Sequence, residues 1–193
     1  MLDFVIQNTN KFIASVPKSK RKQYGQFFTS VSSAEFMASL AAPDLSSPCI
    51  NILDAGAGAG ILSVAQIASL RDRGYKGRLS VSCYETDNNI IPLLNQNLKE
   101  ASLKYEFAFK IIQENYITSQ TFSNATEGAF DIVIGNPPYK KIPKDADEAK
   151  SIPHVCYGAP NLYFLFWAMG INNLKSQGEL VYIIPRSWTS GAY

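Results

Sequence analysis

The sequence predicts an α/β fold in which helices cover both faces of a parallel sheet. Two observations carry this prediction: short, nearly continuous apolar segments alternate with segments of helical apolar spacing, and a glycine-rich turn joins one apolar segment directly to a helical one. Strands buried on both faces have this continuous apolar character, whereas strands with one face in water alternate. With 193 residues, 46% hydrophobic and 18% charged, the chain can bury the core of such a domain.

Each element follows from a local signal. A helix is predicted over 33–41, because Ser32 and Glu35 have the spacing of a capping box and Pro43 ends the segment. Another helix is predicted from the glycine turn to about Arg73. The remaining predicted elements are a helix through Ile90, Leu94 and Leu98, a helix over 161–174, and strands over 49–53, 79–84, 107–112, 130–134 and 180–184.

Polar side chains follow four of the predicted strands at the point where each strand ends. They are Asp54, Glu85, Asn115 and Asn136. Ligands of parallel α/β sheets bind outside the carboxyl ends of the strands, near the point where the strand order reverses. We therefore expect the functional site at this edge of the sheet. The alternative is that these residues are ordinary polar ends of strands.

The glycine turn favours an amino acid over a dinucleotide as its ligand. Gly56, Gly58 and Gly60 are spaced GxGxG, whereas a dinucleotide fingerprint reads GxGxxG and needs glycine where Ile61 stands. Without Cβ atoms the backbone can approach a ligand closely, and the Asp54 carboxylate could pair with a cationic amino group. The alternative is a tight strand-to-helix connection without a ligand.

Glu85 indicates that the ligand also contains a nucleoside. It ends the second predicted strand, 85 − 60 = 25 positions beyond Gly60, where a carboxylate can accept two hydrogen bonds from a ribose diol. A nucleoside joined to an amino acid describes S-adenosylmethionine. The alternative is that Glu85 is a solvated carboxylate.

The segment from Asn136 to Tyr139, Asn-Pro-Pro-Tyr, is the strongest motif of the chain. Its prolines fix the backbone so that the Asn136 side-chain oxygen and the Pro137 carbonyl could face one ligand, while Tyr139 offers an aromatic face. Two such acceptors suit a planar group that bears an NH₂, and would localise its nitrogen lone pair in line with a methyl sulfonium. The alternative is a rigid turn after a strand.

Composition narrows the remaining function classes. Three scattered cysteines and the single histidine, His154, disfavour a disulfide framework and predict no metal site. The longest apolar run, 162–171, is about half the length of a membrane-spanning helix, and the N-terminus has no secretory pattern. We expect a cytoplasmic protein that does not interact with membranes.

Taken together, the motifs resemble the DNA adenine-N6 methyltransferases of restriction-modification systems, in the gamma arrangement. The resemblance rests on Asn-Pro-Pro-Tyr after a strand, with Gly25-Gln26-Phe27-Phe28-Thr29 upstream and Asp54 and its glycine turn between. The segments 161–163 and 178–188 are similar to later motifs of that family. The resemblance implies a Rossmann-like class I methyltransferase sheet, and it covers about Lys20 to the C-terminus.

The resemblance also implies which residues hold each group. By position, the resemblance implies that Thr29 and Asp54, with Gly56 and Gly58 of the turn, hold the methionine part of S-adenosylmethionine. Glu85 would hold its ribose, Asn115 would bind the amino group of its adenine, and Phe166 would form an apolar wall for it. Asn136 and Pro137 would accept from the target amino group, and Tyr139 would stack on the target base. Asn115 departs from the family, which usually has an aspartate there.

The expected partner is double-stranded DNA with a flipped adenine, because the target amino group is otherwise engaged in base pairing. The net charge, 18 − 16 = +2, does not by itself predict a nucleic-acid binder. Local charge does favour one: residues 11–22 carry five basic and no acidic residues, and Lys140, Lys141 and Lys144 follow the motif. A cognate restriction endonuclease or a downstream specificity domain is a further expected partner.

The expected organisation is a helical, basic N-terminal arm over 1–24 and a catalytic domain over 25–193. Because that family continues with further strands and a target-recognition domain, we expect the catalytic domain to be incomplete. Two alternatives stay open. The chain could be a cofactor-binding fragment that is inactive without a downstream part, or its acceptor could be an amino group of RNA or of a protein glutamine.

Overall fold

The computed structural model describes residues 2–19, 29–122, 128–156 and 160–186. The predicted arm boundary at 24, the upstream motif residues 25–28, the basic residues 20–22 and Trp188 lie outside the described residues. Among the residues that are described, none of the helices has the length and apolar character needed to cross a bilayer.

The sheet has five parallel strands in the order β3-β2-β1-β4-β5, which confirms the predicted fold class. The order reverses between β1 and β4, so a crevice for ligands is expected at the carboxyl ends of these two strands. The strands are β1 (Cys49–Ala55), β2 (Arg78–Tyr84), β3 (Ala108–Ile112), β4 (Phe130–Gly135) and β5 (Leu174–Tyr182).

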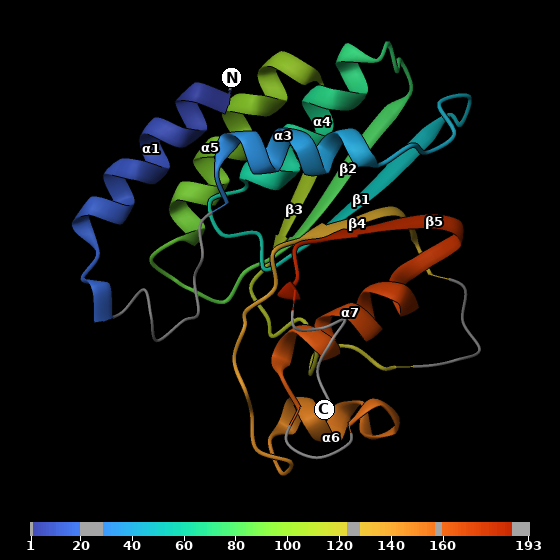
Figure 1. Cartoon of the computed structure of the whole chain (residues 1–193). Helices are drawn as coiled ribbons and strands as arrows, with labels where there is room; N and C mark the ends of the chain where they lie inside the picture. Colours follow the sequence, from blue (N-terminus) through green and yellow to red (C-terminus); the bar gives the residue numbers. More distant parts are fainter. Residues whose placement is uncertain (1, 20–28, 123–127, 157–159, 187–193) are drawn as a thin grey trace.

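Helices cover both faces of the sheet (Figure 1). Alternate residues of β1 show the two cores: Ile52 packs with the helices of one face, and Leu53 with those of the other. The first face carries α1 (Leu2–Ser15), α3 (Val31–Leu40), α4 (Ile61–Asp72) and α5 (Ile91–Tyr105), and the second carries α7 (Leu162–Asn173), with α6 (Asp147–Ser151) and the 3₁₀ turn η1 (Pro153–Val155) packed on α7.

The N-terminal residues form α1, which is part of the packed core. Val5 is fully buried against the first face, and the Asn8 side chain donates to Asn97 of α5 over 3.3 Å. α1 is therefore docked on the helices that flank the glycine turn.

Two predicted boundaries were wrong. The capping box at Ser32 and Glu35 does not form, because the N-cap of α3 is Ser30, whose hydroxyl accepts from the Ser33 backbone N–H. The last strand begins at Leu174 instead of 180, since the polar residues before 180 continue the edge strand and Lys175 pairs with Asp131 of β4 at 2.9 Å. Apolar spacing alone missed this polar half of β5, and it also missed the short elements α6 and η1.

Candidate functional site

The glycine turn lies directly after β1, at the point where the strand order reverses. Gly56 and Gly58 have φ values of +76° and +54°, a left-handed conformation that glycine adopts without strain. The backbone N–H groups of Gly56 and Ala57 both donate to the Tyr84 carbonyl, at 3.0 and 2.9 Å. The turn is therefore fixed to the end of β2, with Gly56 exposed and Gly58 half-buried.

Glu85 belongs to the same unit as the glycine turn. Its Oε2 accepts from the Gly58 N–H at 2.9 Å, and its Oε1 accepts from the N–H groups of Thr86 and Asp87 at 2.7 and 2.8 Å. Burial raises the pKa of Glu85, and these three backbone donors partly offset that rise. Three bonds leave about one acceptor position on a carboxylate, on Oε2, so a second ribose hydroxyl would have to share or displace a backbone donor.

Asp54 lies beneath the turn and is fully buried. Its Oδ2 accepts from the backbone N–H and the hydroxyl of Ser63 in the first turn of α4, at 3.1 and 2.6 Å. No group of the described residues donates to its Oδ1. Burial raises the pKa of Asp54 to about 7, and the nearby Glu85 carboxylate raises it further, against the lowering effect of the Ser63 bonds. Asp54 thus ties α4 to β1 and keeps one buried acceptor unused.

The Asn-Pro-Pro-Tyr segment leaves the end of β4 on the other side of the reversal point. The Asn136 side-chain amide donates to the Thr29 hydroxyl at 3.2 Å, so two residues 107 positions apart are in contact. The Tyr139 hydroxyl lies 2.7 Å from both Asn136 Oδ1 and the Ile183 carbonyl. A phenol has one proton, so these two acceptors share it. Pro137 is buried, and burial raises the pKa of Tyr139 to about 12.

The start of α7 is joined to this segment. The Leu162 backbone N–H donates to the Lys140 carbonyl at 2.7 Å, and the Tyr163 ring meets the Tyr139 ring edge-on, with centroids 6.0 Å apart. The segment 161–163, which resembles a later motif of the family, therefore lies beside Asn-Pro-Pro-Tyr.

Phe166 of α7 forms a wall next to the glycine turn. Its Cε1 would lie 3.7 Å from a Cβ added at Gly56, and its ring packs on Tyr116, with centroids 5.0 Å apart. Tyr116 in turn meets Tyr84 edge-on at 5.1 Å. A row of packed aromatic rings thus runs from Phe166 beside the turn to Tyr84 at the end of β2.

Asn115 has a different set of contacts from those expected of a residue that binds an amino group. Its Oδ1 accepts from the backbone N–H groups of Ile117 and Thr118, at 2.9 and 3.2 Å, and its side-chain amide donates to Glu148 at 2.9 Å. Both lone pairs of the Asn115 oxygen are therefore used within its own turn.

Three positioning residues escaped the sequence prediction: Ser63, Asn97 and Glu148. Asn97 is fully buried and donates to the Ala59 carbonyl within the glycine turn at 2.9 Å. A signal existed for this residue, because Asn97 occupies the apolar face of its helix, where a polar side chain needs a partner. The sequence does not single out Ser63 or Glu148 in this way, because the contacts of Ser63 with Asp54 and of Glu148 with Asn115 depend on how their helices pack.

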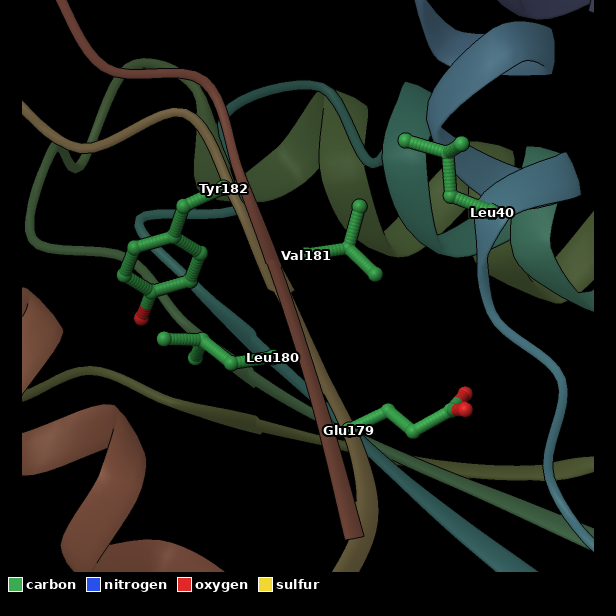
Figure 2. Close-up of a pocket in the computed structure, with 5 residues that line it drawn as sticks. All are labelled: Leu40, Glu179, Leu180, Val181 and Tyr182. Carbon is green, nitrogen blue, oxygen red and sulfur yellow. The ribbon is translucent and has the colours of Figure 1, made fainter.

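A separate hollow lies at the exposed edge of β5. Figure 2 shows Leu40 of α3 beside Val181 of β5, and the hollow is completed by Glu179, Leu180 and Tyr182. None of the predicted site residues lines this hollow, so the candidate site consists of the strand ends described above.

The chain is similar in sequence to known restriction-modification methyltransferases. The family model described as "Eco57I restriction-modification methylase" matches residues 50–193. Two curated relatives are the type II methyltransferases M.PstI of Providencia stuartii and M.BsuBI of Bacillus subtilis, each 33% identical to this chain, over 93% and 90% of it. The chain spans about a third of the length of these relatives, 36% in both cases.

A similar fold occurs in a solved structure. The methyltransferase subunit of a type I restriction-modification system from Streptococcus thermophilus superposes with a TM-score of 0.64, covering 83% of this chain and 35% of that one. The sequence identity is 18%, so this likeness concerns the fold alone.

Proposed function

Because the chain belongs to the Eco57I restriction-modification methylase family, we propose that it transfers a methyl group from S-adenosylmethionine to the N6 amino group of an adenine in double-stranded DNA. The observation that carries the proposal is the Asn-Pro-Pro-Tyr segment at the end of β4. It faces the reversal point of the sheet from one side, while the glycine turn and Glu85 face it from the other.

The residues at the glycine turn fit the proposed cofactor. A buried acceptor without a donor is costly, and the ammonium of a bound methionine moiety would supply one to Asp54 Oδ1. Gly56 is exposed beside Phe166, which gives an apolar chain a surface to lie on. The acceptor position left on Glu85 suits a ribose hydroxyl. The cofactor would supply a methyl group activated by a sulfonium.

Asn136 and Tyr139 fit a planar amino group as the acceptor of the methyl group. The Asn136 amide nitrogen donates to the Thr29 hydroxyl, and its carbonyl oxygen accepts from the Tyr139 hydroxyl. A target N–H would take the place of that hydroxyl. The Tyr139 hydroxyl can then donate its hydrogen bond wholly to the Ile183 carbonyl, which already lies 2.7 Å away. The target nitrogen would form its bond to the methyl carbon as the carbon–sulfur bond breaks, with one amino proton lost to solvent.

The proposal requires the target base to leave the duplex, since its amino group is otherwise paired. The exposed residues Lys140, Lys141 and Lys144 follow Tyr139, where they could contact the phosphates next to an extruded base. Asp145 and Asp147 are exposed in the same segment and limit this attraction. We further propose a cognate restriction endonuclease as the partner of this activity in the cell, in keeping with the family to which the chain belongs.

Methyl transfer from radiolabelled S-adenosylmethionine tests the proposal. The wild-type protein, Asn136→Ala and the matched control Asn95→Ala, an exposed asparagine of α5, are assayed on duplex DNA, RNA and protein. With the wild type and the control we expect label in N6-methyladenine of DNA. With Asn136→Ala we expect the rate of methyl transfer to fall at least a hundredfold, because the lone pair of the target nitrogen is no longer oriented toward the methyl group. Label in RNA or in protein glutamine, with none in DNA, would overturn the substrate assignment.

A further inference from the structure

The contacts of Asn115 raise the question of what binds the base of the cofactor. Its carbonyl oxygen is saturated by the N–H groups of Ile117 and Thr118, and one amide hydrogen goes to Glu148 Oε1. What Asn115 can still offer to a ligand is its second amide N–H. It has no acceptor left for an amino group.

Glu148 brings a carboxylate to the same place. It lies on α6, 33 positions from Asn115, and the bond from Asn115 uses one of the roughly four acceptor positions of a carboxylate. The helix is anchored by the buried Ala149 and by Ile152 just after it, so Glu148 is held half-buried. Its neighbour Asp147, by contrast, has a side chain that is 87% exposed.

The Asn115–Glu148 pair lies one strand outward from Glu85. The Glu85 backbone N–H donates to the carbonyl of Ile112, the last residue of β3, at 3.2 Å, which sets the ends of β2 and β3 side by side. Asn115 follows three residues later, and its neighbour Tyr116 packs on Phe166, which lies against Gly56. The pair is therefore at the same edge of the sheet as the glycine turn, on the β3 side.

This placement matches the direction in which the cofactor must run. In the proposed function the methyl group points to Asn136 after β4, the methionine part lies at the turn after β1, and the ribose lies on Glu85 after β2. The strand order places β3 next, so a base attached to that ribose extends toward the end of β3.

We infer that Glu148 accepts a hydrogen bond from the exocyclic amino group of the cofactor's adenine, beside the remaining amide N–H of Asn115. A carboxylate acceptor next to an amide donor complements the edge of adenine, whose amino donor adjoins a ring nitrogen acceptor. Hypoxanthine has a carbonyl acceptor in place of the amino donor and a ring N–H donor in place of the ring nitrogen acceptor. Its carbonyl would therefore face the Glu148 carboxylate, and its ring N–H would face the amide N–H of Asn115. The inference rests on the proposed function, because it needs S-adenosylmethionine at this edge of the sheet.

Calorimetry with two ligands tests this inference without any need for methyl transfer. S-adenosylhomocysteine carries the amino group, and S-inosylhomocysteine carries a carbonyl oxygen in its place. The wild type should bind the adenosyl compound at least about tenfold more tightly, the difference expected of hydrogen bonds to a charged group. Glu148→Ala should lose most of this preference, mainly through weaker binding of S-adenosylhomocysteine. The matched control Asp147→Ala removes the same charge from the same helix and should keep the preference.

The outcomes separate the inference from the function on which it rests. Equal weakening of both ligands by Glu148→Ala, or no change in either, would overturn the assignment of Glu148 while leaving the cofactor proposal intact. No binding of either ligand by the wild type would overturn the cofactor proposal, and the inference with it. If Glu148→Ala unfolds, Glu148→Gln keeps the size and one carbonyl oxygen, and we expect it to reduce the preference by a smaller factor.

Discussion

The side-chain amide of Asn136 donates to the hydroxyl of Thr29 at 3.2 Å, which joins a residue just before α3 to the end of β4. Because the amide nitrogen is engaged there, the carbonyl oxygen of Asn136 faces Tyr139. In the proposed reaction that oxygen is an acceptor for the target amino group. In that reaction Thr29, expected from its motif to hold the cofactor, would also orient the group that accepts from the target.

Thr29→Val should therefore lower kcat by about tenfold, because the isosteric side chain lacks the acceptor and the Asn136 amide loses one orienting bond. Thr29→Ser keeps the hydroxyl and should restore most of kcat. Steady-state kinetics and cofactor calorimetry check this together. If Thr29 acts only on the cofactor, Thr29→Val would weaken cofactor binding and leave kcat at saturation unchanged.

Substitutions at Tyr139 should separate its ring from its hydroxyl. Tyr139→Phe keeps the aromatic face and loses the hydroxyl that contacts Asn136 and Ile183, so we expect less than a tenfold loss of activity. Tyr139→Ala also loses the stacking surface, which is worth about 1–3 kcal/mol per base, so a tenfold to hundredfold loss is expected. Equal activity of the two variants in a single-turnover assay on duplex DNA would rule out stacking on Tyr139.

The strand ends could be located from the sequence because buried parallel strands are nearly continuous apolar runs, as in residues 132–134 of β4. Asp54, Glu85 and Asn136 could be placed at one edge for the same reason, since the carboxyl ends of parallel strands lie together. The contact between Asn115 and Glu148 could not be predicted. It depends on how α6 packs, and a five-residue helix leaves too few apolar positions to show a period.

The glycines of the chain allow steric crowding to be separated from backbone strain. Gly60 has φ +82°, and an added Cβ would lie 2.8 Å from Leu94 Cδ1, whereas Gly74 has φ +88° with open space around it. Gly74→Ala should lower the free energy of unfolding by about 1–2 kcal/mol, the cost of a left-handed alanine. Gly60→Ala should lower it further and weaken cofactor binding, because it also displaces α5 or the turn. Equal losses in denaturant titrations would contradict this account.

The buried carboxylate of Asp54 should make stability depend on pH. In the unfolded chain Asp54 releases its proton near its ordinary pKa of 3.8, whereas burial raises its pKa in the folded protein to about 7. Between these values the folded state binds more protons, so the free energy of unfolding should fall as the pH rises from about 4 to about 7 and then level off. Because each pH unit corresponds to about 1.4 kcal/mol, the free energy of unfolding should fall by up to about 4 kcal/mol over these three units.

Asp54→Asn removes the titrating group while its oxygen can still accept from Ser63, so the difference in stability between Asp54→Asn and wild type should change across this window. The matched control Asp72→Asn, at the exposed end of α4, should leave the pH profile of the wild type in place. Cofactor affinity should rise over the same window, because an ammonium pairs only with the ionised carboxylate. Denaturant titrations and calorimetry at pH 5, 6, 7 and 8 measure both quantities. A wild-type profile in Asp54→Asn would show that another group titrates, and a cofactor affinity independent of pH would separate Asp54 from the ligand.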